Sequence, residues 1–508
     1  MMNTLDSYSP RPQGWLVWFL RGILFLGALI LLGRLFELQI IKGAYFKSLA
    51  DNNRIKRILI PAPRGKIIAR DGEVIVDNNK DGTRNYVLGN LAGHLTGYLS
   101  ESKEDEVFKV DANCPDKGAR KLGSLVGRGG LEQQYECKLR GIDGEELVEV
   151  DAKGNPIRTL GTVKPTSGED LKTTIDYGLQ KKSAMSMGDK KGAIVVTNPV
   201  GEILALYSSP SFDPNIFIKK DSRKITQALT DNALPMFDRA VNGLYHPGSI
   251  FKIVTSVAAL EDGKIDASFT YNDTGIIKIG DFSYTNWFFT QDGRTEGVID
   301  LPRAIARSTD TFFYKVGELV GVDRLAYWAN KFNLGNKTGV DLPDDTAGLI
   351  PTPAWKRQVK GELWFLGNTY HMAIGQGDVA VSPLAANMIV SVMANSGEVC
   401  KPHLTGGENC TNLNLKKENM DLIKKGMIGA CSKGGTAYPF FDFVPQVACK
   451  TGTAETGEKD KTHAWFAAYA PASDPKIVID VLVEKGGEGS VVAAPIAKDV
   501  LTFWNNRK

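Results

Sequence analysis

The feature that most constrains this chain is an apolar run near its N-terminus, from Trp15 to Phe36. Its only charged residues are Arg21 and Arg34, and the stretch between them would rise only ~18 Å as a helix. A bilayer's hydrocarbon core is about 30 Å thick, so both arginines must extend to the interfaces or face a polar partner. We expect a transmembrane anchor over residues 15–40. A buried hairpin helix is the alternative, which the dense Leu, Ile and Phe content disfavours.

The flanks of this run predict the orientation of the chain. No small-x-small cleavage site follows it, which disfavours a secretory signal peptide. Arg11 and Arg21 favour a cytoplasmic N-terminus, so we expect a cytoplasmic tail over residues 1–14. The chain from about Lys42 onward would then be extracytoplasmic.

Chain length, composition and net charge limit the classes of protein to which this chain can belong. With 508 residues, the chain suits two or three domains. A hydrophobic content of 43% and a charged content of 23% are typical of a folded globular protein. The net charge is only +3 and no basic stripe is present, which argues against nucleic acid as a main partner.

Six cysteines occur as three pairs of sequence neighbours. An even number of cysteines outside the cytoplasm permits disulfides, but six cysteines allow 15 connectivities, so the pairing stays open. None shows the C-x-x-C spacing of a zinc site. The pairs are Cys114 and Cys137, Cys400 and Cys410, and Cys431 and Cys449.

The pattern of predicted secondary structure changes near residues 168–174, where we place a domain boundary. Extended, turn-rich segments at 55–68 and 146–174 predict a β-rich region before it. Apolar runs on both sides of 198–201 predict a hairpin after it. Strand patterns at both ends of this second region suggest one sheet in which the terminal strands pair. Helices are expected at 177–187, 250–260, 301–320, 383–394 and 493–504, and strands at 444–453, 462–470 and 477–483.

The segment His246-Pro-Gly-Ser-Ile-Phe-Lys252 is the first candidate for catalysis. Gly248 precedes an apolar helical run, so Ser249 is expected at a helix start, where backbone amides favour negative charge. Lys252 follows on the same helix face. A serine needs a base beside it to act as a nucleophile, and a desolvated lysine can be neutral enough to take the proton. Taken alone, a serine N-cap beside a solvated lysine is the simpler interpretation.

Arg307-Ser-Thr-Asp310 is the second candidate, inside an amphipathic stretch. Ser308 and Asp310 could project together from a short turn. Because serine and aspartate are frequent before helices, an ordinary cap is the simpler interpretation of this pattern alone.

Lys450-Thr-Gly-Thr453 is the third candidate and ends an extended run. Gly452 removes a side chain where something must approach the strand backbone closely. Lys450, Thr451 and Thr453 then offer one charge and two hydroxyls to an anionic ligand. Alone, this pattern also fits a surface strand.

The three segments are informative together. They follow the order S-x-x-K, S-x-N/D and K-T-G, on an expected helix, loop and strand respectively. This is the serine acyltransferase set of penicillin-binding proteins and β-lactamases. Three independent patterns in this order are hard to explain as coincidence.

Nearly the whole chain resembles the class B penicillin-binding proteins, specifically the elongation-type penicillin-binding protein 2. Asp310 stands where most class B enzymes have Asn, which favours the elongation type over the division type. The resemblance implies an α/β (α+β) fold: a β-rich pedestal with a reduced head over residues 41–172, and a transpeptidase domain over 173–508 with a central antiparallel sheet covered by helices. It also rests on Arg64-Gly-Lys-Ile, Arg70-Asp-Gly, Gly129-Gly-Leu-Glu, Leu139-Arg-Gly and Ile374-Gly-Gln-Gly.

The same resemblance implies a role for each motif residue. Ser249 would be acylated by a D-alanyl-D-alanine stem peptide, with Lys252 as the base. Ser308, between Lys252 and Lys450, would relay a proton to the leaving amine. The terminal carboxylate would be bound by residues of the third motif, and Asp310 and Gly452 would belong to the same binding site. The carboxylate ligands would be Lys450, Thr451 and Thr453.

The resemblance further implies a location and partners. We expect a single-pass protein of the bacterial inner membrane that acts on peptidoglycan stem peptides beside a RodA-type glycosyltransferase and is inhibited by β-lactams. Some family members bind zinc near the active site through Cys and His; residues 281–296 have neither, so we expect no metal and no cofactor. A β-lactam sensor, a β-lactamase and a non-catalytic cell-wall scaffold remain as alternatives.

Overall fold

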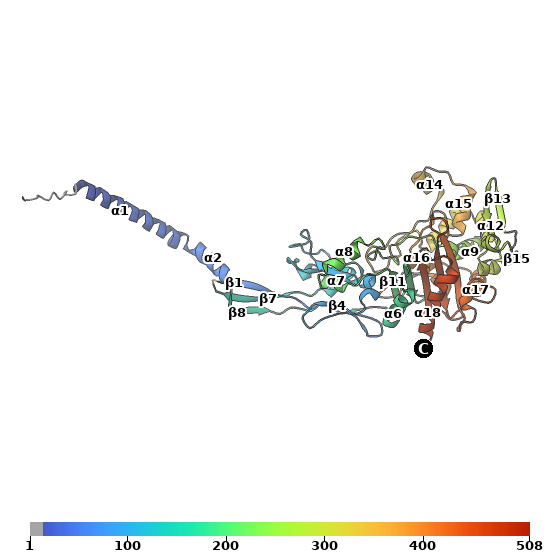
Figure 1. Cartoon of the computed structure of the whole chain (residues 1–508), viewed down its shortest axis with the longest axis horizontal. Helices are drawn as coiled ribbons and strands as arrows, with labels where there is room; N and C mark the ends of the chain where they lie inside the picture. The colour runs from blue at the N-terminus through green and yellow to red at the C-terminus, as the bar shows by residue number, and fades with distance from the viewer. Residues whose placement is uncertain (1–13, 152, 508) are drawn as a thin grey trace, which may run out of the picture. The chain divides into compact units, whose positions relative to one another are not determined.

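The computed structural model describes residues 14–151 and 153–507, and the chain divides into two compact units. The first unit comprises Met1–Ala62 and Ile142–Thr166, and the second comprises Pro63–Gly141 and Ser167–Lys508. Figure 1 follows the chain from helix α1, in blue, to helix α18, in red. The expected cytoplasmic tail lies outside the described residues except for Gly14.

The first unit begins with the apolar helix α1 (Gly14–Phe36), which continues through a π-helical turn (Glu37–Ile41). These 28 residues form the one helix of the described chain that is long and apolar enough to cross a membrane. No residue of α1 is buried. At its end, Glu37 pairs with Arg34 at 2.5 Å and with Lys42 at 2.7 Å. A polar cluster therefore terminates the apolar stretch.

A short helix and a small sheet complete the first unit. Helix α2 (Gly43–Arg54) leads directly into the first strand of a three-stranded antiparallel sheet with the order β1-β7-β8. The extended segments expected near residues 55 and 146 are therefore strands. Their bounds are β1 Ile55–Ile60, β7 Gly144–Val150 and β8 Pro156–Val163.

The second unit opens with a four-stranded sheet of order β4-β3-β2-β9. Glu132, on helix α4 (Gly130–Gln134), is fully buried and binds Arg64 at 2.7 Å and Arg84 at 2.8 Å. Because a buried carboxylate needs partners, these two arginines tie the helix to the sheet. The elements are β2 Ile67–Ile68, β3 Val74–Asn78, β4 Arg84–Tyr86, β9 Leu171–Lys172, the β5–β6 hairpin Tyr98–Glu101 and Leu125–Arg128, and helices α3 Gly93–Thr96 and α5 Glu136–Leu139.

A five-stranded sheet of order β11-β10-β20-β19-β18 forms the centre of the second unit. Every neighbouring pair in it is antiparallel. β10 follows the boundary region and β20 is the last strand of the chain, so the predicted pairing of terminal strands is confirmed. The bounds are β10 Gly192–Thr197, β11 Ile203–Ser209, β18 Ala448–Glu455, β19 Thr462–Ala470 and β20 Ile477–Val483.

Helices cover both faces of this sheet. On one face α16 (Pro383–Ala394) packs on β10, β19 and β20, and α9 (Lys252–Glu261) and α12 (Asp310–Val320) belong to the same core. On the other face lie α6 (Tyr177–Met187) and α18 (Ala494–Asn505). With both faces covered, a strand can be apolar at every position, as β20 nearly is. The expected antiparallel sheet covered by helices is confirmed.

Asp480 is the exception within β20. The side chain is fully buried, and neither carboxylate oxygen has a hydrogen-bond partner in the described part of the chain. Burial raises the pKa of Asp480 well above its ordinary value, because the charged form loses its hydration. The neutral acid is therefore the form that this position favours.

Three disulfides join each cysteine to its sequence neighbour: Cys114–Cys137, Cys400–Cys410 and Cys431–Cys449. Spacing left 15 pairings open, and the fold selects among them. Cys400 and Cys410 face each other on the paired strands β16 (Glu398–Cys400) and β17 (Cys410–Asn412). Cys431, directly after α17 (Lys417–Ala430), meets Cys449 of β18.

Two predicted elements differ from the structure. The expected helix at 301–320 is two helices, α11 (Leu301–Arg307) and α12, and the expected strand at 444–453 begins only at Ala448. The remaining elements are α7 Asn215–Ile218, α8 Ser222–Thr230, β12 Thr270–Asp273, β13 Ile276–Ile279, β14 Phe282–Thr285, α10 Trp287–Asp292, β15 Gly297–Asp300, α13 Val322–Lys331, α14 Pro353–Lys360 and α15 Leu366–Ala373.

Candidate active site

Ser249 lies in a 3₁₀ turn (Gly248–Phe251) directly before α9. Gly248 has a φ of +54°, and its N–H donates to the Gly375 carbonyl at 2.9 Å. A Cβ on Gly248 would lie 3.1 Å from the Thr453 carbonyl oxygen. The glycine therefore lets this turn approach strand β18 closely, and Ser249 is half-buried beside that strand.

Lys252, the first residue of α9, is fully buried. Its Nζ donates to Asp310 Oδ1 at 2.7 Å, to the Ser308 carbonyl at 2.8 Å and to Ser308 Oγ at 3.1 Å. Burial lowers the pKa of Lys252 below its ordinary value, and the Asp310 carboxylate offsets part of that shift. The site therefore brings this ammonium closer to losing its proton while still supplying it with acceptors.

Ser308 breaks the predicted helix. It has a φ of +55°, its N–H donates to the Ile305 carbonyl, and the Thr309 N–H donates to the Ala304 carbonyl. These two bonds form a Schellman motif, a helix end that usually requires glycine. A non-glycine residue in this conformation is strained and is held only where the surroundings determine it. Here the turn aims the Ser308 side chain at Lys252.

Lys450 approaches the same hydroxyl from strand β18. Its Nζ donates to Ser308 Oγ at 2.8 Å and to the Thr451 carbonyl at 3.0 Å. Lys450 is fully buried, and burial together with the positive charge of Lys252 lowers its pKa well below the ordinary value. One serine hydroxyl thus lies between two lysine side chains from segments far apart in the sequence.

A cavity of about 720 Å³ opens over this arrangement. Ser249, Ser308 and Asp310 line it, whereas Lys252 and Lys450 are buried behind the lining. Ser249 is only half-buried and lines the cavity, so a ligand in the cavity can meet it.

The third motif also contributes two hydroxyl residues to the lining of the cavity. Thr451 and Thr453 are lining residues, and Thr451 Oγ1 lies 2.8 Å from Thr436 Oγ1. Gly452 is not a lining residue. A Cβ there would lie 2.9 Å from the Trp465 Cβ and 3.3 Å from the Pro247 carbonyl oxygen, so the close approach at this glycine comes from the protein itself.

Several cavity residues carried no assignment from the sequence. Gln376 bridges the end of β18, because its Nε2 donates to the Thr453 carbonyl at 3.2 Å and its Oε1 accepts from the Glu455 N–H at 3.3 Å. Its segment, Ile374 to Gly377, was noted only for its resemblance to the family. Other lining residues come from segments without a motif, among them Thr285, Trp287, Gln291, Tyr438 and Glu488.

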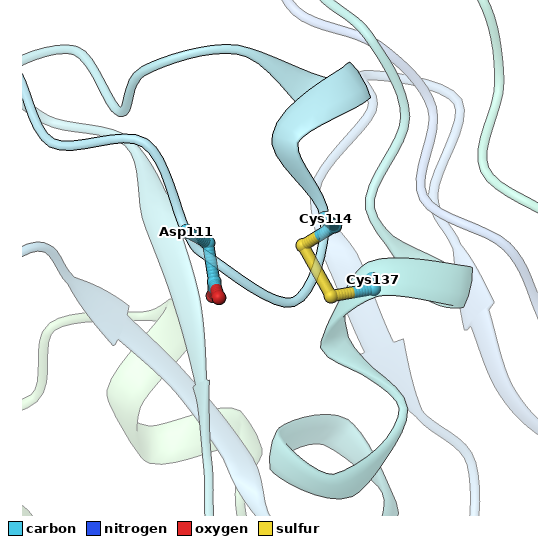
Figure 2. A group of neighbouring side chains, drawn as sticks. All are labelled: Asp111, Cys114 and Cys137. Carbon is cyan, nitrogen blue, oxygen red and sulfur yellow. A yellow bond between two sulfur atoms is a disulfide. The ribbon is translucent and has the colours of Figure 1, made fainter.

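Two side-chain groups have the composition of a metal site but not its chemistry. In Figure 2, Asp111 lies near Cys114 and Cys137, and the two sulfurs are joined in a disulfide. The second group, Glu398 with Cys400 and Cys410, contains a disulfide as well. Metal ligation by cysteine requires the free thiolate, so neither pair can ligate in this oxidised form.

Two buried lysines around a serine hydroxyl, beside a second serine in a cleft, define the serine acyltransferases of the penicillin-interacting class. Comparisons with known proteins identify the family. Residues 192–502 match the penicillin binding protein transpeptidase domain, and residues 79–173 match the penicillin-binding protein dimerisation domain. The chain therefore belongs to the penicillin-binding protein transpeptidases, the family of the PBP2-type peptidoglycan D,D-transpeptidases.

Individual relatives agree. The chain is 34% identical over 454 residues to the peptidoglycan D,D-transpeptidase MrdA of Acinetobacter baumannii, a match that covers 83% of this chain and 66% of the relative. The structure of Pseudomonas aeruginosa PBP2 in complex with WCK 5153 matches with a TM-score of 0.76 and 30% identity, over 88% of this chain and 96% of that one. A chain of a peptidoglycan synthase complex that coordinates polymerization and crosslinking matches with a TM-score of 0.77 and 28% identity, over 96% and 98%.

These findings confirm three predictions from the sequence: the elongation-type penicillin-binding protein 2 family, the transpeptidase fold, and a serine-type D,D-transpeptidase function in cell-wall synthesis. They do not favour a sensor, a β-lactamase or a scaffold.

Proposed function

We propose that Ser249 is the nucleophile with which this chain cross-links peptidoglycan stem peptides during cell-wall elongation. The observation that carries the proposal is the hydrogen-bonded chain Lys252–Ser308–Lys450 behind a half-buried Ser249 at the edge of the cavity. A serine hydroxyl becomes nucleophilic only when a neighbouring group can take its proton. Two lysines with lowered pKa values supply such groups.

The first half-reaction transfers the donor peptide to the enzyme. Ser249 Oγ attacks the carbonyl of the penultimate D-alanine, and its proton passes to the neutral form of Lys252. An ester forms to Ser249, and the peptide bond to the terminal D-alanine breaks. The leaving amine receives its proton through Ser308, which contacts both lysines.

The second half-reaction forms the cross-link. The amine of a second stem peptide attacks the ester, an amide forms, and Ser249 recovers its proton. A β-lactam would acylate Ser249 in the same way and block it. We assign the backbone N–H groups of Ser249 and Thr453 to the oxyanion hole, where one donor contributes about 3–4 kcal/mol in serine hydrolases.

We assign the donor's terminal carboxylate to the third motif. Thr451 and Thr453 line the cavity with hydroxyl groups, and the Lys450 side chain lies buried behind them. Asp310 lines the same cavity and pairs with Lys252. Gly452 belongs to the site indirectly, because its missing side chain lets the Ser249 turn pack against β18.

We further propose that the chain is a single-pass protein of the bacterial inner membrane with an extracytoplasmic catalytic domain. Helix α1 and the turn after it supply the span, and the disulfides suit an oxidising compartment. We propose the domains 1–14 (tail), 15–40 (anchor), 41–172 (pedestal with reduced head) and 173–508 (transpeptidase).

We propose a membrane glycosyltransferase of the RodA type as partner. The support is the match to a chain of a synthase complex that coordinates polymerization and crosslinking, which covers 96% of this chain. Peptidoglycan polymerisation and cross-linking act on the same glycan strand, so a polymerase is the partner expected by that chemistry.

Acylation by a β-lactam tests the central assignment. The full-length protein is incubated with penicillin, and its intact mass is followed over time for the wild type, Ser249→Ala and Ser268→Ala. Ser268 is an exposed loop serine and serves as the matched control. We expect a stable adduct on the wild type and on Ser268→Ala, and loss of about 10⁴-fold or more in the acylation rate of Ser249→Ala.

Three outcomes would contradict the proposal. An adduct on Ser249→Ala would place the nucleophile elsewhere. Rapid release of the drug from the wild type would indicate a β-lactamase. Normal growth of cells that carry only Ser249→Ala would indicate a scaffold whose activity is dispensable.

A further inference from the structure

Asp273, the last residue of β12, is a buried carboxylate that the reaction above does not use. Its side chain is 1% exposed. Oδ1 accepts from Thr311 Oγ1 at 2.6 Å and from the Gly275 N–H at 2.9 Å. Oδ2 accepts from Asn286 Nδ2 at 3.1 Å and from the Glu296 N–H at 2.9 Å. Four donors from four segments therefore converge on one acceptor-only group.

Two of these four partners lead directly to the lysine site. Thr311 is fully buried in the first turn of α12 and follows Asp310 in the chain. Asn286 is fully buried as well, and its Oδ1 accepts from the Asp310 N–H at 3.3 Å. Asp310 is the carboxylate that pairs with Lys252 at 2.7 Å. A single residue, either Thr311 or Asn286, therefore connects the Asp273 carboxylate to Asp310. Asp310 is the counter-ion of Lys252.

The same hydrogen bonds hold one wall of the cavity. Asn286 stands between Thr285, at the end of β14, and Trp287, at the start of α10, and both of these neighbours line the cavity. The Trp287 N–H donates to Asp310 Oδ2 at 3.3 Å, and its Nε1 donates to the Arg307 carbonyl at 2.9 Å. Position 286 therefore fixes the wall and the end of α11 together.

Burial of the Asp273 carboxylate carries a desolvation cost that an apolar core residue would not have. A buried carboxylate without a cationic partner loses its hydration, and only hydrogen bonds compensate for that loss. An apolar side chain could fill the same volume, but it could not fix four donors in direction. Thr311 lies 38 positions after Asp273 in the sequence, so the hydrogen bond between them is not a local capping contact.

We propose that Asp273 is a positioning residue for the transpeptidase reaction: it holds Asp310 against Lys252 and holds the Thr285–Trp287 wall of the cavity. This inference rests on the proposed roles of Ser249 and Lys252. Asp310 is the titratable group whose charge favours the protonated form of Lys252, and the charge of Lys252 in turn lowers the pKa of Lys450. Displacing Asp310 therefore changes the proton affinity of Lys252 and not only the fold.

The test is the rate of acylation by a fluorescent penicillin as a function of pH, on the full chain in detergent. Asp273→Asn places amide hydrogens against existing donors, and Thr311→Val removes one hydroxyl at constant shape. We expect Asp273→Asn to acylate up to about 10-fold more slowly, and Thr311→Val to be slowed less. In both variants, the pH at which the rate rises should move to lower values, because Lys252 loses its counter-ion.

Asp266→Asn is the matched control. Asp266 is exposed, lies just before β12 and also accepts two hydrogen bonds, from the Ser268 N–H at 2.9 Å and from Ser268 Oγ at 2.6 Å. Its acylation rate and pH profile should equal those of the wild type. Thermal unfolding, followed by circular dichroism, gives the folded fraction of each variant.

The outcomes separate this inference from the proposed function. If the wild type forms no adduct on Ser249, the proposed function fails. If the wild type reacts while Thr311→Val and folded Asp273→Asn keep its pH profile, only the positioning role is overturned. Should Asp273→Asn not fold, Thr311→Val decides the question by the same profile.

Discussion

The region behind the active-site cavity and the centre of the sheet both bury titratable side chains, with opposite results. Behind the cavity, Lys252 and Lys450 are fully buried, and each Nζ has at least two acceptors. In the sheet, Asp480 of β20 is equally buried, and neither of its oxygens has a hydrogen-bond partner among the described residues.

The difference shows that partners, and not burial alone, make a buried group useful. Burial lowers the pKa of Lys252, but Asp310 offsets part of the shift. Both the protonated and the neutral form of Lys252 are therefore accessible. Burial raises the pKa of Asp480 with nothing to offset it, so the acid stays neutral. A general base must be able to change its protonation state, whereas a neutral acid in a core cannot take part in the reaction.

The largest expected effect comes from removing the amine of Lys252, the proposed base. Lys252→Met keeps most of the side-chain volume but loses the amine, and it leaves the Asp310 carboxylate without its cation. We expect the rate constant of acylation by penicillin to fall by about 10² to 10⁴-fold. Stopped-flow or quench kinetics of the adduct measure this. A rate within a factor of three of the wild type would contradict the role of Lys252.

A smaller effect should follow from removing the counter-ion. The charge of Asp310 raises the pKa of Lys252, so Asp310→Asn should lower it, and the pH–rate profile should rise at lower pH than in the wild type. The wild-type profile itself should rise below the ordinary lysine pKa of about 10.4, because burial lowers the value in the folded protein. We expect the shift to change the rate at a fixed pH by less than about 10-fold.

The control for this profile is Asp292→Asn, an exposed position at the end of α10. It should leave the profile unchanged. A shift of the Asp310→Asn profile to higher pH would reverse the assigned sign of the interaction.

The smallest effect on activity is expected at Asp480. Asp480→Asn should acylate at the wild-type rate and be more stable. The folded-state pKa of Asp480 is raised, so its contribution to stability is complete below the unfolded pKa of about 3.9 and is lost as pH rises toward the folded pKa. The substitution should therefore stabilise the protein at pH 7, and by less as pH approaches 4.

Unfolding midpoints over a pH series measure this difference. Asp474→Asn, at an exposed position shortly before β20, is the control and should show no such trend. A stability difference that grew toward low pH would mean that Asp480 is charged in the folded protein.

Much of the fold could be predicted from the sequence, because several strands are marked by local sequence patterns. β19 and β20 have the predicted bounds, since each is an apolar run bounded by turn residues. Motif order predicted the residues of the candidate site, and the structure places Lys252 and Lys450 within hydrogen-bonding distance of Ser308. The catalytic roles of these residues stay predictions.

What the sequence could not show depends on long-range geometry. The amphipathic pattern continues on both sides of Ser308, so the sequence suggests a short turn there but not its left-handed backbone. Asp273 is a single acid in a polar stretch, and its partner Thr311 lies 38 residues away. The disulfide pairing needed the positions of strands and helices, because spacing alone does not select among 15 connectivities.

The disulfide Cys431–Cys449 ties the end of α17 to the residue that precedes Lys450. A thiol reductant would leave that strand held only by its pairing with β19 and by packing, and closing a loop of 18 residues typically stabilises a fold by about 3 kcal/mol. Enzyme made in a reducing cytosol and enzyme made by export are therefore two different preparations for assay. Drug-binding rates measured on the first need not describe the second, so the redox history of a sample belongs beside its kinetic constants.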